Sequence, residues 1–171
     1  MFKPTTGTEM GEFAPEANIM VYRDLKKLNV LPPLPLILLY ETQPNMGHWV
    51  LVIETPEGIE HFDSYGIKPD GEISFVPLMF RAQSGQASPH LVRLLLNTGR
   101  PINFSDYQLQ GKDEIATCGR WCVIRLMFAD MPSDDFIKMI AGASQKYGVP
   151  TDLLAVALTE PELVKKMAAN V

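Results

Sequence analysis

The chain has 171 residues, a length typical of one domain, of which 46% are hydrophobic and 20% are charged. These values exclude a disordered chain. Fifteen basic and twenty acidic residues give a net charge of −5. Because phosphate binding needs a net basic face, this balance argues against a protein whose main activity is wrapping nucleic acid, although a local basic patch is compatible with it.

The sequence also argues against export and membrane insertion. Two cysteines, Cys118 and Cys122, are too few for a disulfide scaffold, which favours a reducing compartment. The longest apolar stretch, Val30–Tyr40, contains three prolines and is shorter than the ~20 residues that cross a bilayer. Residues 1–12 have no apolar core, so we expect no signal peptide, no secretion and no membrane binding.

The apolar pattern predicts one α+β domain over 1–171. In chain order we expect a loose arm (1–14), a helix (15–28), three strands (36–40, 48–54, 59–63), a helix (88–97), a fourth strand (102–107), a loop (108–117) and helices over 118–129, 134–146 and 151–168. Because the strands follow one another instead of alternating with helices, the order predicts a mainly antiparallel central sheet flanked by helices. Region 131–171 is expected to be helical, with Pro161 dividing its last helix.

Cys118 begins the apolar segment 118–129 and follows a polar loop. A thiol at a helix start meets the positive end of the helix dipole and unpaired backbone N–H groups, which favour the nucleophilic thiolate. Gly119 beside it allows close approach of the backbone, so that N–H groups face a developing oxyanion. The alternative for Cys118 alone is a buried structural cysteine.

His48 and Asp63 lie fifteen residues apart, on either side of a turn at Gly58. An antiparallel hairpin centred on this turn brings the two ends together, where a carboxylate can orient an imidazole base. His61 and His90 are competing histidines, and a strand-end histidine with a satisfied hydrogen bond is the alternative for His48. In the loop 108–117, Gln110 or Gln108 can donate to an oxyanion, or remain a solvated glutamine.

Four motifs together carry a resemblance over about residues 34–130: GHW at 47–49, FDSYG at 62–66, YQLQG at 107–111 and TCGRWC at 117–122. Their order resembles that of the adenovirus-type maturation proteases (adenain) and the wider Ulp1-like cysteine proteases, which act on ubiquitin-like modifiers. The compact set looks most like the maturation proteases of virophages, Maverick/Polinton-type elements and large DNA viruses. The resemblance implies an Ulp1/adenain-like fold with the nucleophile at the start of a buried helix.

The resemblance also implies roles for single residues. It implies that Cys118 is the nucleophile, His48 the general base and Asp63 the acidic orienter. Gln110 matches the oxyanion donor, although the interval to the cysteine is one residue longer than in the adenovirus pattern, which keeps Gln108 open. Trp49 matches the aromatic residue that shields the imidazole and borders the substrate channel.

Two features of the resemblance are not carried over. Adenovirus proteases use a peptide cofactor linked through a cysteine, but the two cysteines here are already assigned: Cys118 to the nucleophile and Cys122 to the apolar face of its helix. The alternatives for Cys122 are a redox pair or a metal site, for which the spacing is poor. The negative charge argues against activation by DNA. We therefore expect no cofactor, no metal and no strong nucleic-acid binding.

By this resemblance, the expected function is a viral cysteine endopeptidase that cleaves capsid or other virion precursors during particle maturation. The alternatives are an Ulp1-like protease that removes ubiquitin or a ubiquitin-like modifier, and a catalytically silent binding module. We expect viral precursor proteins as partners, a monomer, and a location in the virion and the host-cell cytoplasm, at the viral factory.

Overall fold

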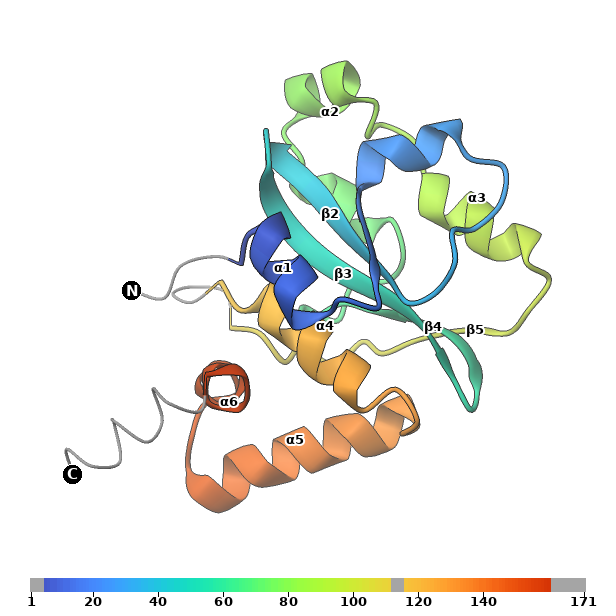
Figure 1. Cartoon of the computed structure of the whole chain (residues 1–171). Coiled ribbons are helices and arrows are strands. Elements are labelled where there is room, and N and C mark those ends of the chain that lie inside the picture. Colours follow the sequence, from blue (N-terminus) through green and yellow to red (C-terminus); the bar gives the residue numbers. More distant parts are fainter. Residues whose placement is uncertain (1–4, 112–115, 161–171) are drawn as a thin grey trace.

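The computed structural model describes residues 5–111 and 116–160 of the chain. A five-stranded sheet forms its centre, with the strands in the order β1-β2-β3-β4-β5 (Figure 1). The strands are β1 (Asn18–Val21), β2 (Leu36–Gln43), β3 (Met46–Thr55), β4 (Gly58–Phe62) and β5 (Ile102–Phe104). The helices are α1 (Gly7–Phe13), α2 (Leu78–Ser84), α3 (His90–Asn97), α4 (Cys118–Met127), α5 (Ser133–Tyr147) and α6 (Thr151–Thr159), with 3-10 turns η1 (Tyr22–Lys27) and η2 (Gly71–Phe75).

The sheet is buried on both faces, which confirms the α+β class and the flanking helices. Along β2, Leu36 and Leu38 pack into one core with residues of η1 and α3. The alternate residues Ile37 and Leu39 pack into a second core with residues of α1, α4, α5 and α6. The continuous apolar run on β2, an inner strand, therefore packs against two layers of helices, as predicted from its composition.

The sheet is mixed, so the prediction of a mainly antiparallel sheet is only partly right. β3 pairs antiparallel with both β2 and β4, but β1 is parallel to β2 and β5 is parallel to β4. The two hairpins have short turns that the local sequence signals. Each edge strand joins the sheet through a longer crossover, η1 on one side and α2 with α3 on the other, and a crossover returns the chain in the parallel direction.

Two N-terminal predictions are wrong. The helix expected over 15–28 is a strand, β1, followed by the 3-10 turn η1. Pairing of β1 with the edge of β2 outweighs the local helical spacing, and a 3-10 turn also brings Tyr22 and Leu25 to one side. The arm expected over 1–14 contains α1, whose capping box joins Thr6 and Glu9.

The remaining boundaries shift by a few residues. The strand predicted over 102–107 ends at Phe104, and the helix predicted from 88 begins at His90. The helices predicted over 118–129 and 134–146 are α4 and α5. The last predicted helix is α6 as far as Thr159, and the expected break at Pro161 lies outside the described residues. α2 and η2 were not predicted.

Arg125 of α4 forms a buried ion pair with Glu60 of β4. Its Nε and Nη2 donate to the Glu60 carboxylate at 3.0 and 2.6 Å, and the two side chains are at most 1% exposed. Arg125→Ala leaves this carboxylate buried without its partner, so we expect a loss of about 3–5 kcal/mol in the free energy of unfolding, measured in urea. Arg100→Ala, which breaks the exposed pair with Glu54, should cost about 1 kcal/mol or less. Equal costs for the two variants would contradict this expectation.

Candidate active site

The hairpin of β3 and β4 brings His48 and Asp63 together. His48 lies near the start of β3, and Asp63 directly follows β4. The imidazole Nε2 is 2.9 Å from Asp63 Oδ2, and both side chains are at most 8% exposed. The other carboxylate oxygen, Oδ1, accepts a hydrogen bond from the backbone N–H of Tyr65 at 2.6 Å. Both oxygens of Asp63 are therefore engaged, and the carboxylate is fixed in one orientation.

Cys118, the first residue of α4, lies on the other side of the imidazole. The residue is 7% exposed, and its thiol and the His48 imidazole are close enough to shift each other's pKa. Since Nε2 of the ring faces Asp63, Nδ1 is the nitrogen left for the sulfur. The backbone N–H groups of Trp49 and Gly119 also lower the pKa of the Cys118 thiol. The helix start and the hairpin thus supply one cysteine, one histidine and one aspartate in series.

The three side chains of this series shift one another's pKa values. Burial alone would lower the pKa of His48, but the hydrogen bonds to Asp63 and Cys118 raise it to about 10. Burial alone would raise the pKa of the Cys118 thiol, but its hydrogen bond to His48 brings it below the ordinary value. Burial opposes ionisation of Asp63 too, and the bond to His48 lowers its pKa. These shifts all favour a thiolate–imidazolium pair beside an ionised aspartate.

The aromatic rings against the imidazole come from two residues that the sequence analysis did not single out. Tyr65 stacks on His48 with ring centroids 4.8 Å apart, and Phe75 approaches edge-on at 6.3 Å. Trp49, expected to shield the base, is 5% exposed, and its indole N–H donates to the Thr5 carbonyl at 2.9 Å. Its indole ring therefore packs in the core and anchors the N-terminal segment.

Of the two candidate glutamines, Gln110 is buried and Gln108 is exposed. Gln110 Oε1 accepts from Ser64 Oγ at 2.8 Å, and its Nε2 donates to the Tyr65 hydroxyl at 3.2 Å. Gln108 Nε2 donates to the Gln110 backbone carbonyl at 2.7 Å. The Gln110 side chain therefore points to the segment that follows Asp63, and the Gln108 side chain holds the backbone of Gln110.

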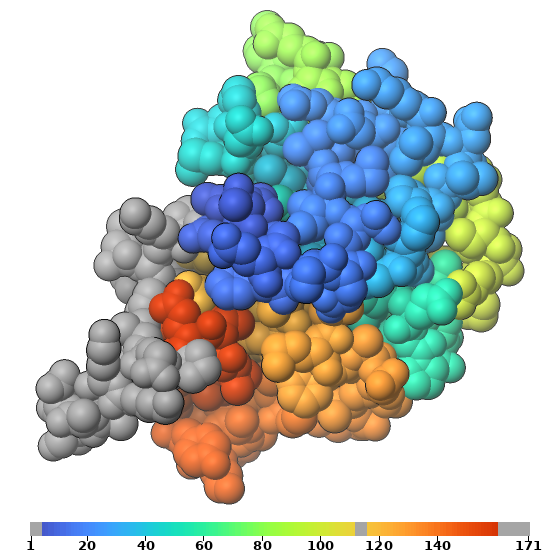
Figure 2. Space-filling view, in the orientation of Figure 1, coloured from blue at the N-terminus to red at the C-terminus, as the bar shows by residue number. Residues whose placement is uncertain are grey.

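Packing around position 119 leaves no room for a side chain, which is a second reason for glycine there besides the close approach of its backbone N–H. A Cβ at this position would lie 2.7 Å from Thr5 Cβ and 3.1 Å from Met10 Sδ. The N-terminal segment therefore lies directly on the first turn of α4. On the face drawn in Figure 2, α1 (dark blue) and α6 (red) both border α4 (orange).

A second buried pair lies behind Asp63. Nε2 of His61 is 3.0 Å from Glu72 Oε1, both side chains are fully buried, and Glu72 and Asp63 are close enough that each carboxyl group shifts the pKa of the other. Burial raises the pKa of Glu72, and the neighbouring Asp63 charge raises it further. Of the two carboxyl groups, Glu72 therefore keeps its proton longer. Glu72 carries no sequence signal, since it lies in a turn-rich segment far from the motifs.

Other candidate features lie away from this series. Cys122 is buried in the apolar core, and burial raises its pKa well above the ordinary value. Within residues 5–111 and 116–160, no group of three or more His, Cys, Asp or Glu side chains could hold a metal ion. A pocket of about 520 Å³ lies at the other end of the β3–β4 hairpin, between residues such as Leu31, Ile53 and Leu126.

These contacts define an α+β protein in which His48 pairs with Asp63 and lowers the pKa of the buried Cys118 at a helix start. Over 151 residues the chain is 34% identical to a protein of Sputnik virophage named Uncharacterized protein V9, and the match covers 84% of this chain and 86% of that protein. The chain therefore belongs to the same family as this virophage protein. No protein-family model and no solved structure matches it. In the described part of the chain, no helix has the length and apolar character to cross a bilayer.

Proposed function

We propose that the chain is a cysteine endopeptidase of the Ulp1/adenain-like fold that cleaves capsid or other virion precursor proteins during particle maturation. The observation that carries the proposal is the buried group of Cys118, His48 and Asp63, in which His48 pairs with Asp63 at 2.9 Å and lowers the pKa of Cys118 at the start of α4. A nucleophile, a base and a group that orients the base are the three parts that covalent acyl transfer requires.

In the proposed reaction, the Cys118 thiolate attacks the carbonyl carbon of the scissile peptide bond. The Gln110 amide and the Gly119 backbone N–H donate to the oxyanion that forms. The His48 imidazolium gives its proton to the leaving amine, and a thioester on Cys118 remains. Neutral His48 then removes a proton from water, which attacks the thioester and releases the carboxylic acid and the thiolate. Asp63 keeps the imidazole in position throughout.

A viral substrate is supported by the family, because the relative is a protein of Sputnik virophage. The resemblance to the adenovirus-type proteases suggests precursors with small residues, often glycine, beside the cut. The described part of the loop 108–117 is the proposed border of the substrate channel, whereas Trp49, the other border that the resemblance implies, packs in the core. We propose that the enzyme acts as a monomer in the virion and at the viral factory, without a cofactor.

The test is cleavage of the capsid proteins encoded alongside this chain, made by cell-free synthesis and mixed with the purified protein. We expect discrete fragments, located by mass spectrometry, and none when the thiols are first blocked with N-ethylmaleimide. A conjugate of ubiquitin with a fluorophore should stay intact.

Two outcomes contradict the proposal. Release of the fluorophore without capsid fragments would identify a modifier-removing protease. Neither reaction, together with a Cys118 that reacts no faster than a free thiol, would identify a catalytically silent module.

A further inference from the structure

One carboxylate of α6 holds both described ends of the loop that connects Gln110 with Cys118. Asp152 Oδ2 accepts the Gly111 backbone N–H at 2.7 Å, and its Oδ1 accepts the Thr117 hydroxyl. Gly111 directly follows Gln110, and Thr117 directly precedes Cys118. The two oxygens of a single side chain therefore link the neighbour of the proposed oxyanion donor to the neighbour of the proposed nucleophile.

The approach of Asp152 depends on a glycine. A Cβ on Gly111 would lie 3.0 Å from Asp152 Oδ2, so any side chain there would crowd the hydrogen bond. Next to Asp152, the Thr151 hydroxyl donates to the Leu109 carbonyl, which holds the loop at a second point. The start of α6 is thus fitted to this loop at consecutive positions.

The opposite side of the loop is attached to the sheet. The Ser64 carbonyl accepts the backbone N–H groups of Leu109 and Gln110, both at 2.8 Å. Ser64 follows Asp63, so this contact ties the donor to the His48–Asp63 end of the site. The contact with Asp152 ties the same donor to the start of α4, and the two attachments together determine where the Gln110 amide lies relative to the Cys118 sulfur.

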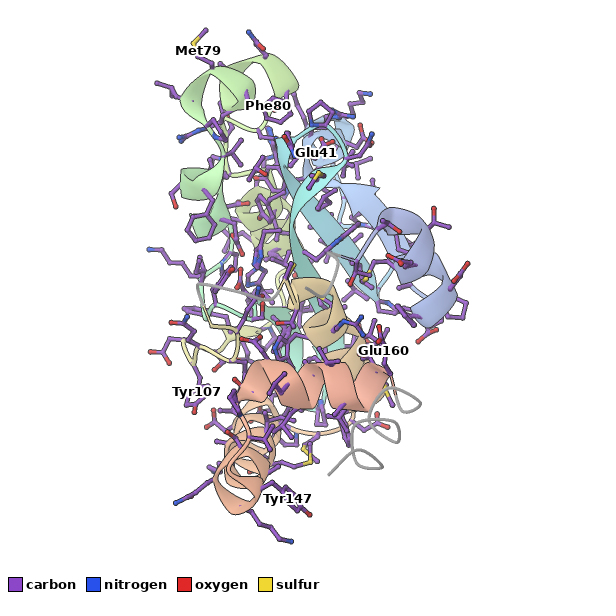
Figure 3. All side chains as sticks on the ribbon, turned by 90° about the vertical axis from the view of Figure 1, so that its left-hand side faces the viewer. Glu41, Met79, Phe80, Tyr107, Tyr147 and Glu160 are labelled. Atoms are coloured by element: carbon purple, nitrogen blue, oxygen red, sulfur yellow. The ribbon has the colours of Figure 1, made fainter. Side chains whose placement is uncertain are left out.

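The far end of α6 is attached to α4 separately. Arg120 donates to the Thr159 hydroxyl and pairs with Glu160, which lies at the C-terminal end of α6 (Figure 3). These contacts hold the helix but do not involve the loop. Breaking them therefore provides a control for the general effect of loosening α6.

We propose that Asp152 is a positioning residue that fixes the Gln110 loop against the start of α4 and so aligns the oxyanion donor with Cys118. This inference rests on the proposed function, because it assigns Asp152 a role in that same reaction. A residue that only docks α6 would affect all thiol reactions alike. A residue that aligns the oxyanion donor should affect a reaction that forms an oxyanion and leave unchanged a reaction that forms none.

Two thiol reactions separate these possibilities. With p-nitrophenyl acetate, the Cys118 thiolate bonds to the acetyl carbon through a tetrahedral oxyanion, p-nitrophenolate leaves with the electron pair, and water then hydrolyses the thioester. With iodoacetamide, the sulfur bonds to the methylene carbon, iodide leaves and no oxyanion forms. The ratio of the two rates therefore reports oxyanion stabilisation without knowledge of the natural substrate.

For Asp152→Ala we expect acylation by p-nitrophenyl acetate to slow by about tenfold or more, and alkylation by iodoacetamide to stay within about twofold. Gln110→Ala should show the same pattern with a loss of about 10²–10³-fold. Asp152→Asn keeps one acceptor oxygen and should recover part of the rate. Glu160→Gln should change neither reaction. In Asp152→Ala, hydrogen exchange at the Gly111 amide should accelerate.

Three results would overturn the inference: acylation in Asp152→Ala equal to that in Glu160→Gln, an equal loss in both thiol reactions, or unchanged exchange at Gly111. A wild-type protein that acylates no faster than its Cys118→Ala variant would instead overturn the proposed function. Since the exchange measurement needs no catalysis, the two failures are distinguishable.

Discussion

Cys118→Ala is expected to reduce peptide cleavage and acylation by about 10⁴-fold or more, while Cys122→Ala leaves both within about twofold. The two thiols lie one helical turn apart on α4 and are both buried, so they form a matched pair. They differ in their surroundings: Cys118 is hydrogen-bonded to His48, which lowers its pKa, whereas burial in the core raises the pKa of Cys122. Initial rates with capsid precursor and with p-nitrophenyl acetate measure the effect.

Thermal unfolding of both variants is the control, because each substitution removes a buried sulfur of similar size and should cost a similar amount of stability. If Cys122→Ala loses as much activity as Cys118→Ala while both remain folded, the assignment of the nucleophile is wrong. If neither variant loses activity, the chemistry lies outside the Cys118–His48–Asp63 series.

The second large effect is expected from His48→Ala, which should abolish acyl transfer to a similar extent and change the pH dependence of alkylation. In the wild type the pKa of Cys118 is lowered by the hydrogen bond to His48, so labelling should stay fast well below pH 8. Without the imidazole, burial raises the pKa of the thiol, and only the backbone N–H groups of Trp49 and Gly119 oppose it. A thiol of pKa about 8.5 is ionised in roughly one molecule in 300 at pH 6, so labelling there should slow by about 10²-fold.

The measurement is the iodoacetamide rate between pH 5 and pH 10 in about one-unit steps, with peptide mass mapping to separate Cys118 from Cys122. His90→Ala is the matched control, because His90 contacts the Gly85 carbonyl and Tyr22, far along the chain from the site. A profile for His48→Ala that coincides with the wild type would show that the two side chains do not share a proton.

The pairing of His48 with Asp63 should also make the stability of the fold depend on pH, and the free energy of unfolding should fall as the pH rises. The pKa of His48 is raised to about 10 in the folded chain, so the stabilisation from its charged form is fully present below about pH 6.5. It is lost as the pH rises through about 10. In His48→Ala the fall in stability over this interval should shrink.

Local patterns were sufficient for the elements that carry the motifs. Alternating and continuous apolar runs predicted β2, β3 and β4, and the turn at Gly58 joined two of them into the hairpin on which His48 and Asp63 meet. The apolar segment that begins at Cys118 predicted α4. Each of these elements can be predicted from a few consecutive residues, because strand alternation, turn residues and helix starts are local patterns.

Long-range contacts determine the rest of the site, and short windows of sequence do not contain them. Asp152 reaches the loop from about forty residues away, and Glu72 reaches Asp63 through a turn of irregular backbone. Tyr65 meets His48 because the two flank the same hairpin. Each of these residues acquires its partner only after the chain has folded, so its own neighbours give no indication of the contact.

The N-terminal region gives the clearest contrast between local preference and tertiary pairing. Its apolar spacing favours a helix over 15–28, yet residues 18–21 pair with the edge of β2 as a parallel strand. Residues 7–13, polar in appearance, form α1 because Met10 packs on Gly119 at the start of α4.

The sequence alone was enough to establish the α+β class, the central hairpin and the residue types of the site. Tertiary packing determined the edge strands, the N-terminal cover of α4 and the attachment of the Gln110 loop to α6. The reason is that a segment pairs where its backbone hydrogen bonds are satisfied and its apolar side chains are buried at the same time.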